Sequence, residues 1–282
     1  MNEQVILITG ATGKQGGSLI KALAGKGLRL RAMTRKPESD AARALSALGA
    51  EVVAGDLNDA ASVERALQGA WGAFGVQNTW EAGVEAEEAQ GKRFAELARK
   101  TGVQHFVYSS VGSAHRATGI PHFDNKWRIE QTVRGLDFPS HVIFRPVFFM
   151  ENLTSPWFLN GDALYAAMNP STVLQMIATE DIGRFISRAF LDPAGMNRRE
   201  IDLAGDALTI PQAAATLSQA FGRTINFVQV PIEDVRKNSE DFALMLEWFD
   251  RVGYEADIPA LQREFGFTPL TLADWAARQP KA

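Results

Sequence analysis

The chain has 282 residues, of which 46% are hydrophobic and 22% are charged, so it can bury the core of one large or two small globular units. Its formal net charge of −4 supplies no basic field for a phosphate backbone, and nucleic-acid binding is therefore not expected. There is no cysteine, which excludes disulfides, thiolate catalysis and cysteine-ligated metal sites.

The N-terminus runs directly into an apolar segment. After Met1–Gln4 comes Val5–Ile8, without a basic region, a long apolar region or a small-residue cleavage site. No run of the sequence approaches the ~18 apolar residues of a membrane span. We therefore expect a soluble, cytoplasmic protein without a membrane partner.

Short runs of β-branched and aromatic residues alternate with helical patterns along the first half of the chain. The strand candidates are Val5–Thr9, Leu28–Met33, Glu51–Ala54, Ala70–Val76, His105–Ser110 and His141–Phe144. The segments between them have helical patterns, among them Ser18–Gly27, Ser62–Gly69 and Glu85–Gly102. This alternation predicts βαβ units and an α/β fold with a doubly wound parallel sheet.

The regularity ends after Pro146. Phe148–Leu153 and Pro156–Leu159 are aromatic, apolar and loop-like, which suits a pocket wall or lid, although core packing is the commoner use of such residues. Further on we expect helices over Thr179–Leu191, Pro211–Gly222, Glu233–Gly253 and Leu261–Ala277, and strands over Glu200–Ala204 and Asn226–Pro231. The predicted organisation is a sheet domain over 1–153, to which 172–206 return, and a smaller domain from 154–171 and 207–282.

A glycine-rich loop connects the first strand to the first helix. Its sequence is Gly10-Ala11-Thr12-Gly13-Lys14-Gln15-Gly16-Gly17, with the spacing G-x-x-G-x-x-G. Glycines at such a turn allow backbone N–H groups to approach a pyrophosphate, and the helix N-terminus adds a partial positive charge. The pattern predicts a Rossmann-type dinucleotide site, with an ordinary glycine turn as the alternative. Its expected cofactor-binding residues are Gly10, Thr12, Gly13, Lys14, Gln15 and Gly16.

The end of the second strand indicates which dinucleotide is bound. An acidic residue there would bind the ribose hydroxyl of NAD, but this chain has Arg35 and Lys36 instead. The Arg35 guanidinium suits a 2′-phosphate, so we expect NADP(H); a solvated basic pair is the alternative.

The ends of the third and fourth strands supply further candidates. Asp56 and Leu57 are expected near the adenine, and Gln77 and Asn78 near the ribose and nicotinamide. Both Asp56 and Asn78 could equally be turn or cap residues.

The fifth strand and the following helix carry the candidate proton-transfer groups. Short-chain dehydrogenases place a Ser after this strand and Tyr-x-x-x-Lys on the helix, where the phenol protonates the carbonyl that receives hydride. Here Ser109 and Ser110 end the strand and Lys126 is expected to begin the helix. His122 stands four residues earlier, where the tyrosine would be. The remaining histidines, His105, His115 and His141, lie singly, so no metal site is expected.

At these positions the chain resembles the NmrA-like family of atypical short-chain dehydrogenases/reductases, especially its NADPH-sensing members. The matching stretches are Thr9–Gly17, Thr34–Pro37, Val76–Trp80, His122–Lys126, Arg145–Pro146 and Met150–Leu153, with Asp181–Gly183 in the C-terminal part. The resemblance implies NADP(H) binding with Lys126 on the nicotinamide ribose and Gly13, Gln15, Gly16 and Arg35 on the phosphates. It also adds Phe149 and Asn152 to the cofactor site.

Relatives of this kind are either regulators that respond to NADP(H) or reductases of quinones, dyes and unsaturated small molecules. The absent tyrosine disfavours carbonyl chemistry, because a neutral imidazole beside the Lys126 ammonium is a weak proton donor. A quinone could still collect its proton from water or Ser110. The sequence favours a redox sensor with weak or no dehydrogenase activity and a protein partner. The alternative is an NADPH-dependent reductase with a small apolar substrate, with Lys126, His122 and Ser110 as catalytic residues. A homodimer is left open.

Overall fold

The computed structural model describes residues 4–279 and contains a seven-stranded parallel sheet. Its strands follow the order β3-β2-β1-β4-β5-β6-β11. Their bounds are β1 Val5–Ile8, β2 Arg29–Thr34, β3 Glu51–Ala54, β4 Gly72–Gly75, β5 His105–Ser109, β6 Ser140–Pro146 and β11 Glu200–Leu203. The predicted doubly wound α/β fold is therefore confirmed, and the strand order reverses between β1 and β4, where such folds bind ligands.

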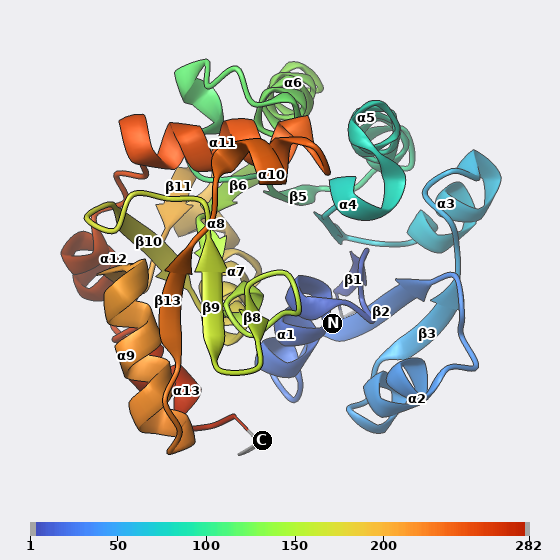
Figure 1. Ribbon diagram of the computed structural model, residues 1–282. Helices are drawn as coiled ribbons and strands as arrows, with labels where there is room; N and C mark the ends of the chain where they lie inside the picture. Colours follow the sequence, from blue (N-terminus) through green and yellow to red (C-terminus); the bar gives the residue numbers. More distant parts are fainter. Residues whose placement is uncertain (1–3, 280–282) are drawn as a thin grey trace.

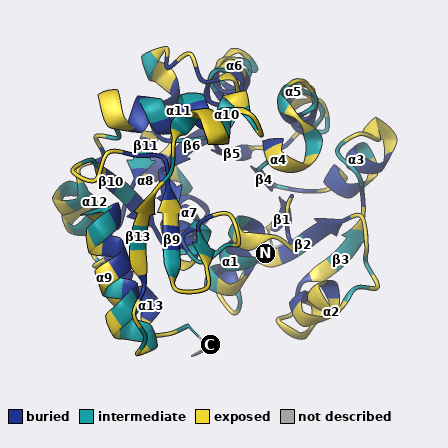
Figure 2. Ribbon diagram, in the orientation of Figure 1, coloured by how far each residue is buried: buried dark blue, intermediate teal, exposed yellow. Residues whose placement is uncertain are grey.

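Helices cover both faces of this sheet. They are α1 Lys14–Leu23, α2 Asp40–Ala47, α3 Ala60–Leu67, α4 Thr79–Ala82, α5 Val84–Lys100, α6 Pro121–Gly135, α7 Thr179–Leu191 and α8 Pro193–Met196. Every residue of β1, β4 and β5 is buried, as continuous apolar runs between two helical layers should be. Figure 2 shows the exposed residues concentrated on the outer sides of helices such as α2 and α3.

Two small sheets and a group of helices make up the rest of the described chain. One sheet has the order β12-β10-β7 and the other β13-β9-β8. Their strands are β7 Phe148–Phe149, β8 Leu159–Asn160, β9 Ala163–Ala166, β10 Val173–Ile177, β12 Asp206–Thr209 and β13 Asn226–Gln229. The helices are α9 Ile210–Phe221, α10 Ile232–Arg236, α11 Glu240–Arg251, α12 Ile258–Phe265 and α13 Leu272–Ala276, with single 3-10 turns at Ala114–Arg116 and Met150–Asn152.

These elements have a hydrophobic core of their own. Its buried residues include Phe148, Phe158, Leu217 and Trp248, and α6 contributes Phe123 from the sheet side. Figure 1 shows the blue N-terminal strands on one side of the molecule and the orange and red C-terminal helices on the other. The domain boundaries expected from the sequence remain a prediction.

Helix α7 returns from this second part to the sheet by packing closely on α1. A Cβ atom on Gly183 would lie 2.5 Å from the carbonyl carbon of Ser18, so only glycine allows this approach. The neighbouring Asp181 is fully buried and accepts a hydrogen bond from the Leu270 backbone N–H at 2.6 Å. Burial raises the Asp181 carboxyl pKa although Arg184 lies against it. The Asp181–Gly183 stretch therefore joins α1, α7 and the C-terminal segment.

Several sequence-based expectations about the helices and strands were wrong. The expected helix over Glu233–Gly253 breaks between α10 and α11, because Ser239 caps a new helix by accepting from the Phe242 N–H. The expected helix over Leu261–Ala277 is interrupted after Gly266, which is left-handed at φ 69°. The short strands β7, β8, β9, β10 and β12 were not predicted. No helix within residues 4–279 combines the length and apolar character of a membrane span.

Candidate functional site

The glycine loop forms a close-packed turn at the switch point of the sheet. Gly10 has φ +57°, and a Cβ on Gly16 would lie 2.4 Å from the Gly10 carbonyl oxygen. Thr9 fixes the base of the turn, because its hydroxyl donates to the Phe74 carbonyl at 3.1 Å and accepts from the Val76 N–H at 2.9 Å. The loop therefore requires glycine at two positions where the sequence has it.

Helix α1 begins without a capping side chain. Its N-cap residue, Gly13, makes no side-chain hydrogen bond, and there is no acidic residue in the first turn. Gly10, Thr12, Gly13 and Lys14 are exposed, so the loop and the start of the helix are accessible. An uncapped helix N-terminus with a positive partial charge suits a pyrophosphate, and these residues fit a dinucleotide.

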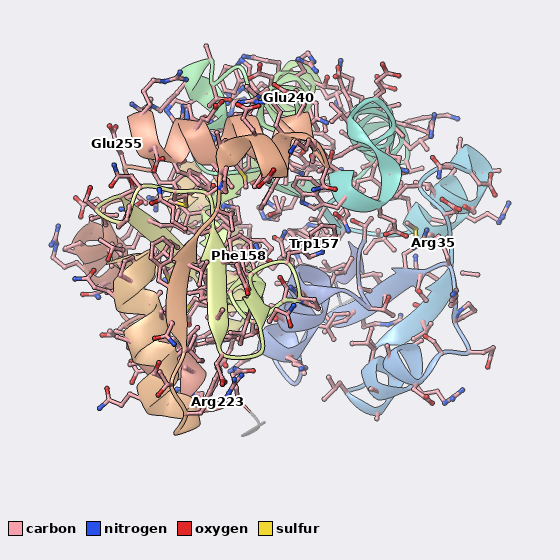
Figure 3. The ribbon with its side chains drawn as sticks, in the orientation of Figure 1. Arg35, Trp157, Phe158, Arg223, Glu240 and Glu255 are labelled. Atoms are coloured by element: carbon pink, nitrogen blue, oxygen red, sulfur yellow. The ribbon has the colours of Figure 1, made fainter. Side chains whose placement is uncertain are left out.

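Arg35 lies beyond the end of β2, exposed, and forms an ion pair with Glu81 of α4. Lys36 is exposed next to it, and its backbone N–H donates to the Thr34 hydroxyl at 3.2 Å. The Glu81 carboxylate, which the sequence did not indicate, therefore occupies the guanidinium of Arg35 that was expected to bind a 2′-phosphate. Figure 3 shows Arg35 on the sheet side of the molecule and the 81% exposed Trp157 between it and Phe158.

Two of the residues expected near the adenine and ribose, Asp56 and Asn78, accept hydrogen bonds from nearby backbone N–H groups. Asp56 accepts from the Asn58 N–H at 2.9 Å, and Asn78 caps α4 by accepting from the Trp80 N–H at 3.2 Å. The turn and cap roles that the sequence left open are thus both present. Leu57 is half-buried in the sheet core, with its carbonyl accepting from Arg93.

Gln77 differs from its neighbours. Its side chain is buried, and neither its amide nitrogen nor its amide oxygen has a hydrogen-bond partner among the described residues. An unsatisfied buried amide costs roughly 1–3 kcal/mol, so it is a position where a bound ligand would supply the missing partners. This fits the predicted contact with the nicotinamide half of a dinucleotide.

Lys126 lies on α6, which begins at Pro121 rather than at Lys126 as expected from the sequence. Its Nζ atom lies 2.8 Å from Oε1 of Glu87, a fully buried carboxylate on α5. The other carboxylate oxygen of Glu87 accepts from Asn125 at 3.0 Å. Lys126 is therefore held by a buried ion pair, because an unpaired charge at Glu87 would be strongly disfavoured.

His122 lies one turn before Lys126 on the same helix. Its Nδ1 atom is bonded to Oδ1 of Asp241 at the start of α11, and only 6% of its side chain is exposed. Its ring also packs on Trp80 of α4 at a centroid distance of 5.2 Å. The sequence interpretation took the Lys126 ammonium as the charged group that acts on His122. In the structure, His122 instead contacts Asp241, and Lys126 is paired with Glu87.

Of the two serines at the end of β5, one has a hydrogen-bond partner and the other has none among the described residues. Ser109 donates from Oγ to Oε1 of Gln15 at 2.6 Å, which ties the strand to the first turn of α1. The Ser110 hydroxyl is buried without a partner among the described residues. Phe149, on β7, and Asn152, at the end of the following 3-10 turn, are both half-buried. The fold therefore brings Ser109, Gln15 and the glycine loop together.

Two functional candidates, Glu87 and Asp241, were missed by the sequence analysis. Glu87 had one available signal, because it is an acidic residue that interrupts the inward face of a predicted amphipathic helix. Asp241 had none, since it meets His122 across 119 residues of sequence.

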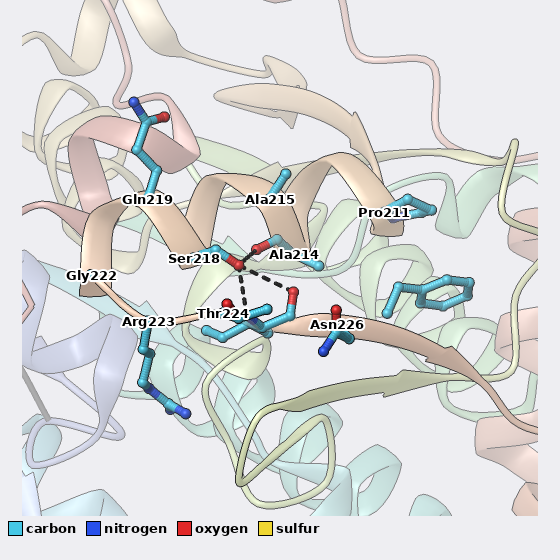
Figure 4. A pocket seen from close by; sticks show the side chains of 11 residues that line it. Pro211, Ala214, Ala215, Ser218, Gln219, Gly222, Arg223, Thr224 and Asn226 are labelled. Atoms are coloured by element: carbon cyan, nitrogen blue, oxygen red, sulfur yellow. Dashed lines mark hydrogen bonds between the residues drawn. The ribbon is translucent and has the colours of Figure 1, made fainter.

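A surface hollow of about 740 Å³ lies away from this site. It is lined by α9, the loop that follows it and β13, including Ser218, Gly222, Arg223 and Asn226, as Figure 4 shows. The Ser218 hydroxyl in it is already satisfied, by the Ile225 N–H at 2.8 Å among others. Within residues 4–279 no three His, Asp or Glu side chains are arranged to hold a metal ion.

A parallel sheet in this strand order, with a glycine loop at its switch point, defines an α/β protein of the Rossmann class, whose members bind dinucleotides there. The family model of the NmrA-like family matches residues 2–275, and this chain belongs to that family.

Relatives and solved structures agree with this assignment. The NmrA-like family domain-containing oxidoreductase FrzB of Cladobotryum sp is 29% identical over 255 residues, which are 80% of this chain and 76% of FrzB. The structure of NmrA, a negative transcriptional regulator, in complex with NADP has a TM-score of 0.81 at 24% identity and covers 99% of this chain and 95% of its own. The NADPH complex of quinone oxidoreductase QOR2 from Escherichia coli has a TM-score of 0.79 at 24% identity, covering 96% and 98%. These two structures establish the shared fold.

Proposed function

We propose that this protein binds NADP(H) and uses it to reduce a small unsaturated acceptor such as a quinone. The observation that carries the proposal is the placement of Lys126 and His122 one turn apart on α6, the helix that follows β5, with the end of β5 bonded to the glycine-loop helix through Ser109 and Gln15. A dinucleotide held by the glycine loop would extend past this edge of the sheet.

The cofactor assignment depends on named residues. Gly10 and Gly16 allow the tight turn that presents the start of α1 to a pyrophosphate, and Lys126 would bind the nicotinamide ribose. Arg35 would exchange Glu81 for the 2′-phosphate, which is the stronger partner for an exposed guanidinium. NmrA has been solved with NADP and the quinone reductase with NADPH, which supports the same class of cofactor here. Bound NADPH would supply a hydride to the acceptor.

The acceptor would lie among apolar residues. Trp80 and Trp157 are large exposed aromatic side chains, 58% and 81% exposed, from α4 and from the segment before β8. Exposed aromatic side chains of this size suit a flat, conjugated ligand. Quinones fit this description better than sugars or charged acids.

A redox sensor is the second candidate function. It is favoured by the absence of a tyrosine at position 122 and by the contact of His122 with α11, through which cofactor occupancy could be transmitted to the C-terminal part. NmrA, a regulator, shares the fold. In this case NADP(H) would bind without turnover, and a protein partner would respond to the occupied state.

The test is NADPH consumption by the purified protein across a panel of quinones and aldehydes, with NADH in parallel. Turnover of a quinone supports the reductase, and tight binding without turnover supports the sensor. In the same experiment Arg35→Ala should weaken NADPH binding more than NADH binding by about 1–3 kcal/mol, the range for a charge-assisted hydrogen bond. If Arg35→Ala weakened the binding of NADPH and of NADH equally, the assignment of Arg35 to the 2′-phosphate would be refuted.

A further inference from the structure

We infer that Asp241 is a positioning residue that makes His122 the proton donor of this site. The inference rests on the proposed reductase function and deepens it, because it supplies the acid that the missing tyrosine would have been. It also gives the C-terminal part, through α11, a direct role at the reacting end of the cofactor.

The His122–Asp241 pair is well enclosed. The two side chains are 6% and 15% exposed, and the bond joins Nδ1 of the imidazole to Oδ1 of the carboxylate. An ion pair in this environment is screened far less by water than one at the surface. Asp241 is in the first turn of α11, which Ser239 caps from outside the helix, so the backbone that carries the carboxylate is fixed.

Aromatic rings prevent the imidazole from turning away. The His122 ring lies 4.7 Å from the Phe123 ring and 5.2 Å from the Trp80 ring, and Trp80 in turn meets Phe242 of α11 at 5.8 Å. Because Asp241 occupies Nδ1, Nε2 is the ring nitrogen left for a substrate. A carboxylate on one imidazole nitrogen selects the tautomer and orients the other nitrogen, as in catalytic triads.

The other charged groups near His122 are already paired. On α6, the Lys126 ammonium lies against Glu87 of α5, and on α4, Glu81 lies against Arg35. Asp124 of α6 accepts from the Thr118 hydroxyl at 3.2 Å. Asp241 of α11 is therefore the carboxylate that compensates a positive charge on the His122 ring.

The chemical step balances with this one donor. NADPH is the reductant, and its hydride brings two electrons and one hydrogen to the acceptor while an acceptor π bond breaks. The proton moves from Nε2 of the His122 imidazolium to the acceptor oxygen and leaves a neutral imidazole paired with Asp241. Water then reprotonates Nε2, so a quinone becomes a hydroquinone with the uptake of one proton overall.

The experiment compares Asp241→Asn with Glu240→Gln, a matched change on the neighbouring residue, which pairs with Arg236 at the surface. Asp241→Asn should lower kcat for the quinone by about 10- to 100-fold, which is at or below the lower end of the roughly 10²- to 10⁴-fold that a general acid itself contributes, with little change in KM. Glu240→Gln should retain the wild-type kcat and KM, and Asp241→Glu should recover part of the loss.

A second readout does not require turnover. The chain has four histidines, so their ring protons can be followed by NMR, with His122→Asn used to assign the His122 signal. At a fixed pH the wild-type His122 ring should keep its Nδ1–H on Asp241, and Asp241→Asn should remove that Nδ1–H signal or mix the two tautomers. An unchanged His122 ring spectrum in Asp241→Asn would overturn the positioning role whatever the activity. A wild-type protein that binds NADPH but reduces no acceptor would instead refute the proposed reductase and, with it, the donor role.

Discussion

Replacing Gly16 by alanine tests the packing on which the whole cofactor site depends. The new Cβ would lie 2.4 Å from the Gly10 carbonyl oxygen and 2.6 Å from its carbonyl carbon, whereas ordinary contact begins at 3.4 Å. Both are backbone atoms, so helix α1 has to retreat from the loop by about 1 Å. Overpacking of this kind costs about 1–3 kcal/mol, which corresponds to a fall in Tm of roughly 2–5 °C for a chain of this size.

The same displacement separates the first-turn N–H groups of α1 from the pyrophosphate. Losing one hydrogen bond to the charged pyrophosphate costs about 1.5–3 kcal/mol, so NADPH affinity should fall by roughly 10- to 100-fold, measured by titration calorimetry beside thermal unfolding. Gly135→Ala is the control, because a Cβ at the end of α6 meets nothing within 4 Å. A Gly16→Ala protein with wild-type Tm and wild-type affinity would refute the reasoning.

Two further predictions concern stability. Burial lowers the pKa of His105 to about 4, and since the unfolded ring takes up its proton near pH 6.5, stability falls as pH drops from about 6.5 to 4 by up to ~1.4 kcal/mol per unit; His105→Gln should flatten this slope in urea unfolding, and an unchanged slope would contradict the assignment. Arg145 is paired with the fully buried Glu130 at 2.7 Å, so Arg145→Met should cost about 3 kcal/mol by leaving that charge poorly compensated. The double change with Glu130→Gln should recover most of the loss, and additive losses would rule this explanation out.

The sheet could be predicted from the sequence because its signals are local. Val5–Ile8 is a continuous apolar run, as a strand buried on both faces must be, and the glycine loop follows it at once. Thr179–Leu191 was placed with the bounds that α7 has, since its apolar residues recur with helical spacing on one face. The secondary structure of these elements can therefore be predicted from the residues within each segment.

The second part of the chain and the pairing in the site could not be predicted in this way. Strand β8 has two residues, and β9 is Ala163–Ala166, which contains no β-branched residue. The pairs His122–Asp241 and Lys126–Glu87 depend on how α4, α5, α6 and α11 pack, which no local pattern records. Local patterns therefore identify His122 and Lys126 as candidates but not their partners Asp241 and Glu87.

The seven-stranded sheet has a consequence for how the chain folds during synthesis. Strand β11, at one edge of the sheet, pairs with β6 over Glu200–Leu203. The close contact of Gly183 with Ser18 joins α7 to α1. At about 5–20 residues per second, the ribosome needs roughly 3–10 seconds to pass from residue 153 to residue 203. During that time the side of α1 that packs on α7 and the edge of β6 that pairs with β11 stay uncovered, so a fragment of residues 1–153 should expose apolar surface that the full chain buries.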